Sequence, residues 1–167
     1  MNVSIRPYVP FDYQACRALW VELTERHREI YDDATIGGDD PGTEFDTHLA
    51  KVTLLATWVA VKDGDAIGFC SLLSEGRNGE IDPIVVRSAE RSRGVGRELL
   101  GVAIEDAKRR GIRHLSIRPV VRNVEAIQLY NDVGFRTLGH LDMFMDLSDT
   151  PGKWKPGVSI HGRDFEY

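Results

Sequence analysis

The chain has 167 residues, of which 42% are hydrophobic, and it carries a formal net charge of −5. This size and composition suit a single domain that buries its own core. The negative charge argues against a nucleic-acid partner, and no segment approaches the apolar length that spans a membrane, so we expect a cytoplasmic protein without a membrane partner.

The cysteines and histidines show no spacing typical of a metal site. Cys16 and Cys70 lie far apart in amphipathic segments with no CxxC pair, so we expect two buried small residues rather than a disulfide. The five histidines form neither an HxxH nor an HExxH motif. No metal is therefore expected.

The N-terminal third predicts a strand, a helix, a loop and a second helix. Val3 and Ile5 alternate with polar residues as in a short strand, and Pro10 suits the first turn of a helix. Residues 32–41 are rich in Asp and Gly, which predicts a loop, and a short helix is expected over residues 44–50. The apolar residues of the first helix recur every three or four positions, which predicts a core-facing stripe of Tyr13, Cys16, Trp20, Leu23, His27 and Ile30.

Three strands are expected next. Residues 57–62 and 66–73 are rich in β-forming residues and are joined by Asp63-Gly64-Asp65, which predicts a hairpin. Residues 80–86 continue this meander as a third strand. Pro83 lies inside it and predicts a bulge or a missing ladder bond.

The remaining elements alternate between helices and strands. Apolar spacing predicts a helix from Val95 that ends at Gly111, followed by a strand over residues 114–118. Asn123 is a plausible N-cap for a helix that stops near Gly134.

Two final strands are expected over residues 135–138 and 141–147. The tail from residue 148 contains Pro and Gly at short intervals and is expected to be irregular. We therefore divide the chain into a domain over residues 1–147 and a tail over 148–167, packed on that domain or on a partner.

The turn before the Val95 helix has the composition of an anion site. It contains Arg91, Gly94 and Gly96, and the N–H groups of a helix N-terminus attract phosphate. A tight strand-to-helix turn would also need these glycines, so the turn alone does not decide between the two interpretations. Leu99 stands where a dinucleotide-binding fingerprint needs glycine, and Arg97 follows Gly96 where a Walker loop needs lysine.

The pattern Arg91-x-x-Gly94-x-Gly96 resembles the Gln/Arg-x-x-Gly-x-Gly/Ala signature of the GNAT N-acetyltransferase family. A second block, Asn123-x-x-Ala126-x-x-x-Tyr130 followed by Gly134-Phe135, resembles the other characteristic block of that family. The resemblance covers residues 80–135, about a third of the chain.

The resemblance implies a mixed α+β fold. Its central, mostly antiparallel sheet of about six to seven strands is splayed between the fourth and fifth strands and flanked by about four helices. It also implies that acetyl-CoA binds with its pyrophosphate on the turn and its pantetheine arm along the preceding strand. The residues so assigned to the coenzyme are Ile84, Val85, Val86, Arg91, Ser92, Arg93, Gly94, Val95, Gly96, Arg97, Asn123 and Tyr130.

Three residues are catalytic candidates. Tyr130 could donate a proton to the departing thiolate, although its spacing to Ile127 also suits a core residue. Glu80 stands where some family members carry a catalytic glutamate, and Asp82 shares its strand face. Either carboxylate could act as the base, hold a cationic substrate, or be solvated, and a water relay is a further alternative.

The predicted function is transfer of an acetyl group from acetyl-CoA to a primary amine on a small molecule or a peptide, by direct attack. The alternative is a non-catalytic acyl-CoA sensor of the same fold. Charge is unevenly distributed, which suggests a cationic acceptor, and the apolar residues of the tail are compatible with a homodimer. The acidic cluster comprises Asp32, Asp33, Asp39, Asp40, Glu44 and Asp46, and the basic one Arg87, Arg91, Arg93 and Arg97.

Overall fold

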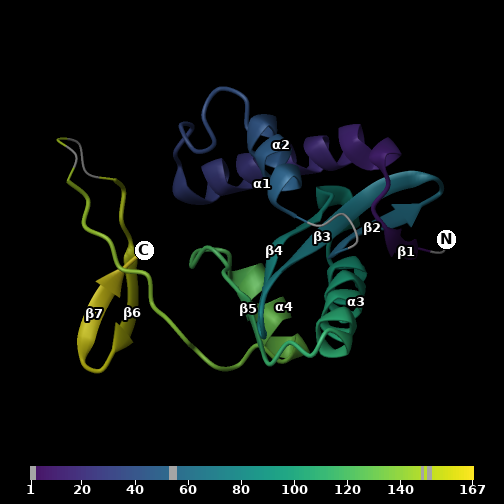
Figure 1. Ribbon diagram of the computed structural model, residues 1–167. Coiled ribbons are helices and arrows are strands. Elements are labelled where there is room, and N and C mark those ends of the chain that lie inside the picture. The colour runs from purple at the N-terminus through teal and green to yellow at the C-terminus, as the bar shows by residue number, and fades with distance from the viewer. Residues whose placement is uncertain (1–2, 53–55, 148, 150–151) are drawn as a thin grey trace.

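The structure is a computed structural model, and it describes residues 3–52, 56–147, 149 and 152–167 (Figure 1). A five-stranded sheet lies between two layers of helices, and a separate hairpin lies beside it. The strands are β1 (Val3–Pro7), β2 (Thr57–Lys62), β3 (Asp65–Glu75), β4 (Asn78–Val86), β5 (His114–Ile117), β6 (Pro156–Ile160) and β7 (Arg163–Glu166). The helices are α1 (Tyr13–Tyr31), α2 (Gly42–Lys51), α3 (Val95–Arg109) and α4 (Val124–Val133).

The central sheet has the order β1-β2-β3-β4-β5. Neighbouring strands are antiparallel from β1 to β4, whereas β5 is parallel to β4. The mixed α+β fold with a mostly antiparallel sheet and four helices is thus confirmed. The expected number of six to seven strands in this sheet is wrong, because the sheet has five among the described residues.

Each face of the sheet buries its own apolar cluster. Phe45, Phe69 and Val85 belong to the cluster beneath α1 and α2, and Leu72, Ile81 and Leu99 to the cluster against α3. In Figure 1 the two pairs of helices cover opposite faces of the sheet. The cysteines are divided between these clusters, and both are free and buried as predicted.

Strand β4 is irregular near its middle. Cys70 of β3 pairs with Ile84, while Leu72 pairs with Ile81, so two residues of β4 lie opposite one residue of β3. The bulge predicted at Pro83 is confirmed. It places Ile81 and Ile84 on the same side of the sheet, packed against the α3 cluster.

The C-terminal part differs from the prediction. Residues 135–147 form no strand, although their alternation predicts two, because no strand in the described part of the chain lies beside them to pair with. The tail is not wholly irregular, since β6 and β7 form a hairpin around His161-Gly162. Both turn residues have positive φ, 50° and 72°, as a two-residue hairpin turn of type I′ requires. In the part of the chain that the structure describes, no helix is long and apolar enough to cross a membrane.

Candidate coenzyme and acceptor site

The N-terminus of α3 forms a concave turn lined by backbone. Ser92 and Gly94 have φ values of 59° and 88°, so the chain passes twice through the left-handed region. The first intrahelical bond runs from Glu98 N to Gly94 O at 3.1 Å. The N–H groups of residues 95–97 precede this bond and have no partner within the helix, which suits an anionic ligand.

The arginines around this turn have two different roles. The Nε atom of Arg91 donates to the Val86 carbonyl at 2.9 Å, and Arg87 donates to the Ala66 carbonyl, so these side chains hold the turn against the sheet. Arg93 and Arg97 are instead exposed at 62% and 53%. Arg93 Nη1 lies 3.7 Å from Glu90 Oε2, and Arg97 pairs with the exposed Asp132 at 3.0 Å. These two side chains are placed to meet an anion from solvent.

Gly96 also has a packing role. A Cβ atom there would lie 3.1 Å from Leu129 of α4 and 3.8 Å from Val86 of β4. The close packing around Gly96 supports the interpretation that this glycine is needed for a tight turn. It is also compatible with the interpretation that the turn binds an anion. At Gly94, by contrast, an added Cβ would meet nothing within 4 Å, and the constraint is the left-handed φ.

Strands β4 and β5 diverge after a short ladder. Pairing covers only residues 78–81 of β4 and 114–117 of β5, although β4 continues to Val86. The β5-facing backbone of Ile84, Val85 and Val86 therefore lies beyond the ladder. The predicted splay between the fourth and fifth strands is present, and the turn before α3 follows directly at its wide end.

Tyr130 lies on α4 and packs against the α3 cluster. Its ring contacts Phe135 edge-on, at 6.4 Å between centroids. Burial raises the pKa of Tyr130 to about 12, so its hydroxyl keeps its proton at neutral pH. No described residue forms a hydrogen bond with that hydroxyl, which leaves it available to a ligand.

Asn123 caps α4 as predicted. Its Oδ1 atom accepts a hydrogen bond from Ala126 N at 3.2 Å. The cap fixes the start of α4, and hence the position of Tyr130 two turns later.

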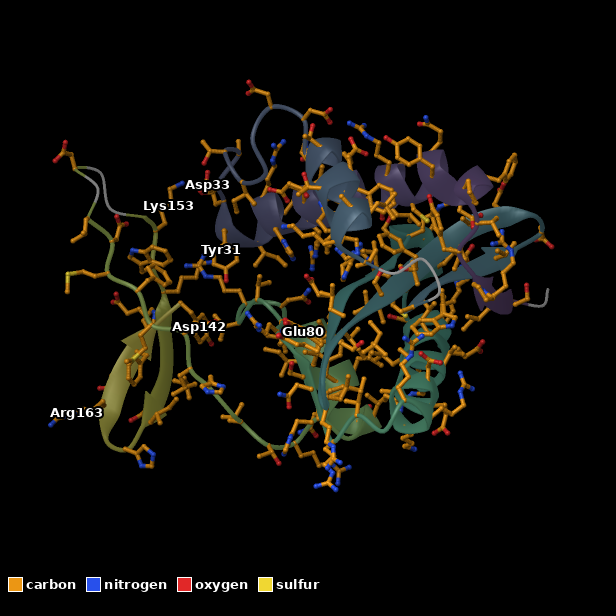
Figure 2. The ribbon with its side chains drawn as sticks, viewed as in Figure 1. Tyr31, Asp33, Glu80, Asp142, Lys153 and Arg163 are labelled. Atoms are coloured by element: carbon orange, nitrogen blue, oxygen red, sulfur yellow. The ribbon has the colours of Figure 1, made fainter. Side chains whose placement is uncertain are left out.

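Glu80 lies beside β5, at the narrow end of the splay. It pairs with Ser116 across the ladder, and its Oε2 atom accepts from Arg118 Nη2 at 2.8 Å. Both side chains line a cavity of about 400 Å³, with Lys51 and Leu73 on its other walls. In Figure 2 Glu80 lies within the sheet, below α2.

A buried polar network lies below α2, next to Asp82. His48 Nε2 is 3.1 Å from Ser71 Oγ, which is 2.9 Å from Thr57 Oγ1. Burial lowers the pKa of His48, the nearby charge of Asp82 raises it, and Lys51 lowers it. Sequence analysis did not identify this network, because its members come from three elements and share no spacing.

We expect the stability of the protein to fall as the pH drops below about 6.5, the ordinary histidine pKa. Burial lowers the pKa of both His48 and His27 in the folded chain, so the unfolded chain binds more protons below 6.5. Stability is therefore highest above about pH 6.5. It decreases as the pH falls toward the lowered pKa values that these histidines have in the folded chain. Thermal midpoints of wild type and His48→Gln at several pH values should show a smaller loss in the variant. His140→Gln, at an exposed position, is the matched control and should leave the loss unchanged.

Three carboxylates of the acidic loop (residues 32–46) have side-chain partners from elsewhere in the chain, and two of these partners are cations. Asp40 pairs with Arg17 at 2.5 Å, and Asp46 accepts from the Tyr13 hydroxyl at 2.7 Å. Asp32 pairs with Lys153 of the tail. Figure 2 shows Asp33 and Lys153 near the end of α1. The loop therefore presents less free negative charge than its sequence suggests.

The fold and this arrangement define a GNAT-type acyltransferase architecture, and comparison with known families agrees. The model of the acetyltransferase (GNAT) family matches residues 16–135, which is more than half of the chain. The chain belongs to the GNAT acetyltransferase family.

Individual relatives are more distant. The streptothricin acetyltransferase of Streptomyces lavendulae is 36% identical over 86 residues, which are 50% of this chain and 46% of that protein. This chain thus matches about half the length of that curated relative.

Solved structures share the fold at low identity. A GNAT acetyltransferase from Staphylococcus aureus Mu50 has a TM-score of 0.69 at 14% identity, over 89% of this chain and 94% of that one. The structure of AAC(6')-Iy with a bisubstrate analogue, CoA-S-monomethyl-acetylneamine, has a TM-score of 0.62 at 17% identity, over 89% and 100%. The ribosomal-protein-S18-alanine N-acetyltransferase of Escherichia coli has a TM-score of 0.64 at 19% identity, over 83% and 80%.

Proposed function

We propose that this protein is an N-acetyltransferase that transfers the acetyl group of acetyl-CoA to a primary amine. The observation that carries the proposal is the splay between β4 and β5, which opens toward the turn at the N-terminus of α3. The backbone turn would hold the phosphates, and the gap between the strands would hold the pantetheine arm. The two features follow one another, which is the arrangement that an extended coenzyme thioester needs. Residues 1–147 are proposed to form the catalytic unit.

The coenzyme is proposed to bind through its pyrophosphate at the turn. The N–H groups of Val95, Gly96 and Arg97 face this position, and the exposed side chains of Arg93 and Arg97 add positive charge. The Val86 carbonyl already accepts from Arg91. The pantetheine arm would therefore use the remaining β5-facing groups of Ile84, Val85 and Val86, with Asn123 nearby.

The reaction is a direct attack within a ternary complex. The amine lone pair forms a bond to the thioester carbonyl carbon, the C–S bond breaks, and the amine loses one proton. The thiolate that leaves takes a proton from the Tyr130 hydroxyl, which is protonated at neutral pH. Glu80, Asp82 or a water molecule between them accepts the proton of the amine.

The acceptor is proposed to be a basic amine that enters by the cavity beside Glu80. Arg118 occupies one carboxylate oxygen of Glu80, and no described residue forms a hydrogen bond with the other. Glu80 and Asp82 lie on one face of β4 by alternation, so together they can attract an ammonium group. The acetyltransferase activity named for the streptothricin acetyltransferase relative, and the complex of AAC(6')-Iy with CoA-S-monomethyl-acetylneamine, support an acetyl acceptor here.

The alternative is an acyl-CoA sensor of the same fold. An assay of coenzyme A thiol release from acetyl-CoA distinguishes the two functions. The amines to be tested are polyamines, aminoglycosides, amino acids and peptide N-termini. We expect thiol release that depends on the amine and is faster for polycationic acceptors than for other amines. High salt should reduce this difference in rate. Tight acetyl-CoA binding without release for any amine would favour the sensor.

Glu80→Gln is expected to lower turnover by about 100-fold or more, the usual contribution of a general base. The loss should be largest at neutral pH and smaller at alkaline pH, where more of the amine is already deprotonated. The measurement is turnover against pH at saturating acetyl-CoA. Asp82→Asn on the same strand face is the matched variant. If only Asp82→Asn loses turnover, Asp82 is the base, and if neither does, the proton leaves through water.

A further inference from the structure

The cavity beside Glu80 is lined by side chains of both charge signs. Its volume is about 400 Å³, near the lower end of the range of roughly 300–1,000 Å³ that is usual for ligand sites. This size suits a small molecule. The charged residues of its lining are Lys51, Arg110, Arg118, Glu75 and Glu80.

Buried apolar side chains also line this cavity. Val52, Ala56 and Leu72 are each at most 9% exposed, so they meet the cavity from the protein interior. Ala56 and Leu72 belong to the α3 cluster, which holds them in place. The cavity therefore combines an apolar inner surface with charged groups, which suits a short methylene chain that carries charges at its ends.

Two of the three cations have partners within the chain. Arg110 Nε lies 2.5 Å from Asp106 Oδ2, so its charge is matched at the end of α3. Arg118 donates through Nη2 to Glu80 Oε2 at 2.8 Å, and its side chain is 71% exposed. A guanidinium group has five N–H donors. Arg118 can therefore bind a second carboxylate while it keeps its bond to Glu80.

Lys51, the last residue of α2, is the third cation. Its side chain is exposed, and no described residue forms a hydrogen bond or an ion pair with its ammonium group. Its charge lowers the pKa of His48, which Asp82 of β4 raises, so both charges lie near that histidine. Glu80 lies below α2 in Figure 2. Lys51 thus places an unpaired positive charge in the same cavity as Glu80.

The charges that remain in the cavity are balanced. Arg110 is already matched by its partner on α3. The other charged residues of the lining are two cations, Lys51 and Arg118, and two carboxylates, Glu75 and Glu80. A ligand with a carboxylate beside its ammonium groups meets each sign with its opposite, whereas a simple amine leaves the two cations without a counter-charge.

We propose that the acceptor is a small diamino acid with a free carboxylate. Lys51 and Arg118 bind the carboxylate, the methylene chain lies along the buried apolar residues, and the amine that is acetylated faces Glu80. This inference rests on the proposed function and narrows its acceptor. Among amines with the same number of ammonium groups, it selects the one that also carries a carboxylate.

Calorimetric titration in the presence of coenzyme A tests this ligand class without any turnover. The probes are lysine and ornithine, together with cadaverine and putrescine, which are the same molecules without the carboxylate. We expect each amino acid to bind about 10-fold or more tightly than its amine, as charge-assisted hydrogen bonds to one carboxylate allow. Equal affinity within both pairs, or no measurable binding of either amino acid, overturns the proposal.

Lys51→Met removes the cation at an exposed position and keeps a side chain of similar length. The affinity for lysine should fall about 10-fold, whereas the affinity for cadaverine should stay the same or rise, because a like charge is lost. Lys108→Met is the matched control, since Lys108 is exposed on α3 and pairs with Glu105. A preference for the amino acid that survives in Lys51→Met overturns the proposal.

Thiol release from acetyl-CoA with the same four probes separates this inference from the proposed function. We expect kcat/KM to be higher for each amino acid than for its amine, by about the ratio of their affinities. Preferential binding of the amino acids without thiol release for any probe would support the ligand class and contradict acetyl transfer. Thiol release at equal kcat/KM within both pairs would support acetyl transfer and overturn the diamino acid.

Discussion

Tyr130→Phe is expected to lower turnover by about 100-fold or more, the usual contribution of a general acid. The affinity for acetyl-CoA should change little, because the hydroxyl acts on the thiolate as it leaves rather than on the bound thioester. Burial holds the pKa of Tyr130 at about 12. The loss should therefore be nearly constant from neutral to mildly alkaline pH.

Rapid-quench measurement of the acetyl-transfer step, with coenzyme affinity from calorimetry, checks this prediction. Tyr8→Phe is the matched control, since Tyr8 is buried in the opposite core cluster, beneath α1 and α2. An unchanged transfer rate in Tyr130→Phe would make Tyr130 a packing residue of the α3 cluster. Equal losses in both variants would indicate a general effect on stability.

Gly94→Val is expected to weaken acetyl-CoA binding by about 10-fold or more. The φ of Gly94 is 88°, and a non-glycine residue forced into a sparsely populated region costs about 1–3 kcal/mol. Each 1.4 kcal/mol is about a tenfold change in affinity. The turn can relieve this strain only by moving the N–H groups that are proposed to hold the pyrophosphate.

Gly101→Val is the matched control for this variant. An added Cβ at Gly101 would meet nothing within 4 Å, as at Gly94, but Gly101 lies within α3 and has no positive φ. Calorimetric titration with coenzyme A should show the loss only for Gly94→Val. If both variants bind equally well, the turn before α3 does not hold the coenzyme.

The sequence by itself determined the elements whose signals are local. Asp63-Gly64 between two β-rich runs predicts the β2–β3 hairpin, Pro83 predicts the bulge in β4, and Asn123 predicts the start of α4. Each depends on backbone preferences of a few consecutive residues, which act the same way in any fold. The two family blocks lie on such elements, so the turn before α3 and the position of Tyr130 could also be predicted.

Only the tertiary structure decided how the elements meet. The ion pair of Glu80 with Arg118 and the network of His48 with Ser71 and Thr57 join residues distant in sequence. The charge of the acidic loop likewise depends on Arg17 and Lys153, which no local pattern connects to it.

Residues 135–147 also show that sequence patterns alone do not decide how elements pair. Their alternation specifies an apolar face, and that face requires a partner. A strand forms only where a neighbour offers its backbone, so pairing is a property of the assembled sheet rather than of the segment. The sequence therefore determined that this segment could be a strand, whereas in the tertiary structure it pairs with no strand among the described residues.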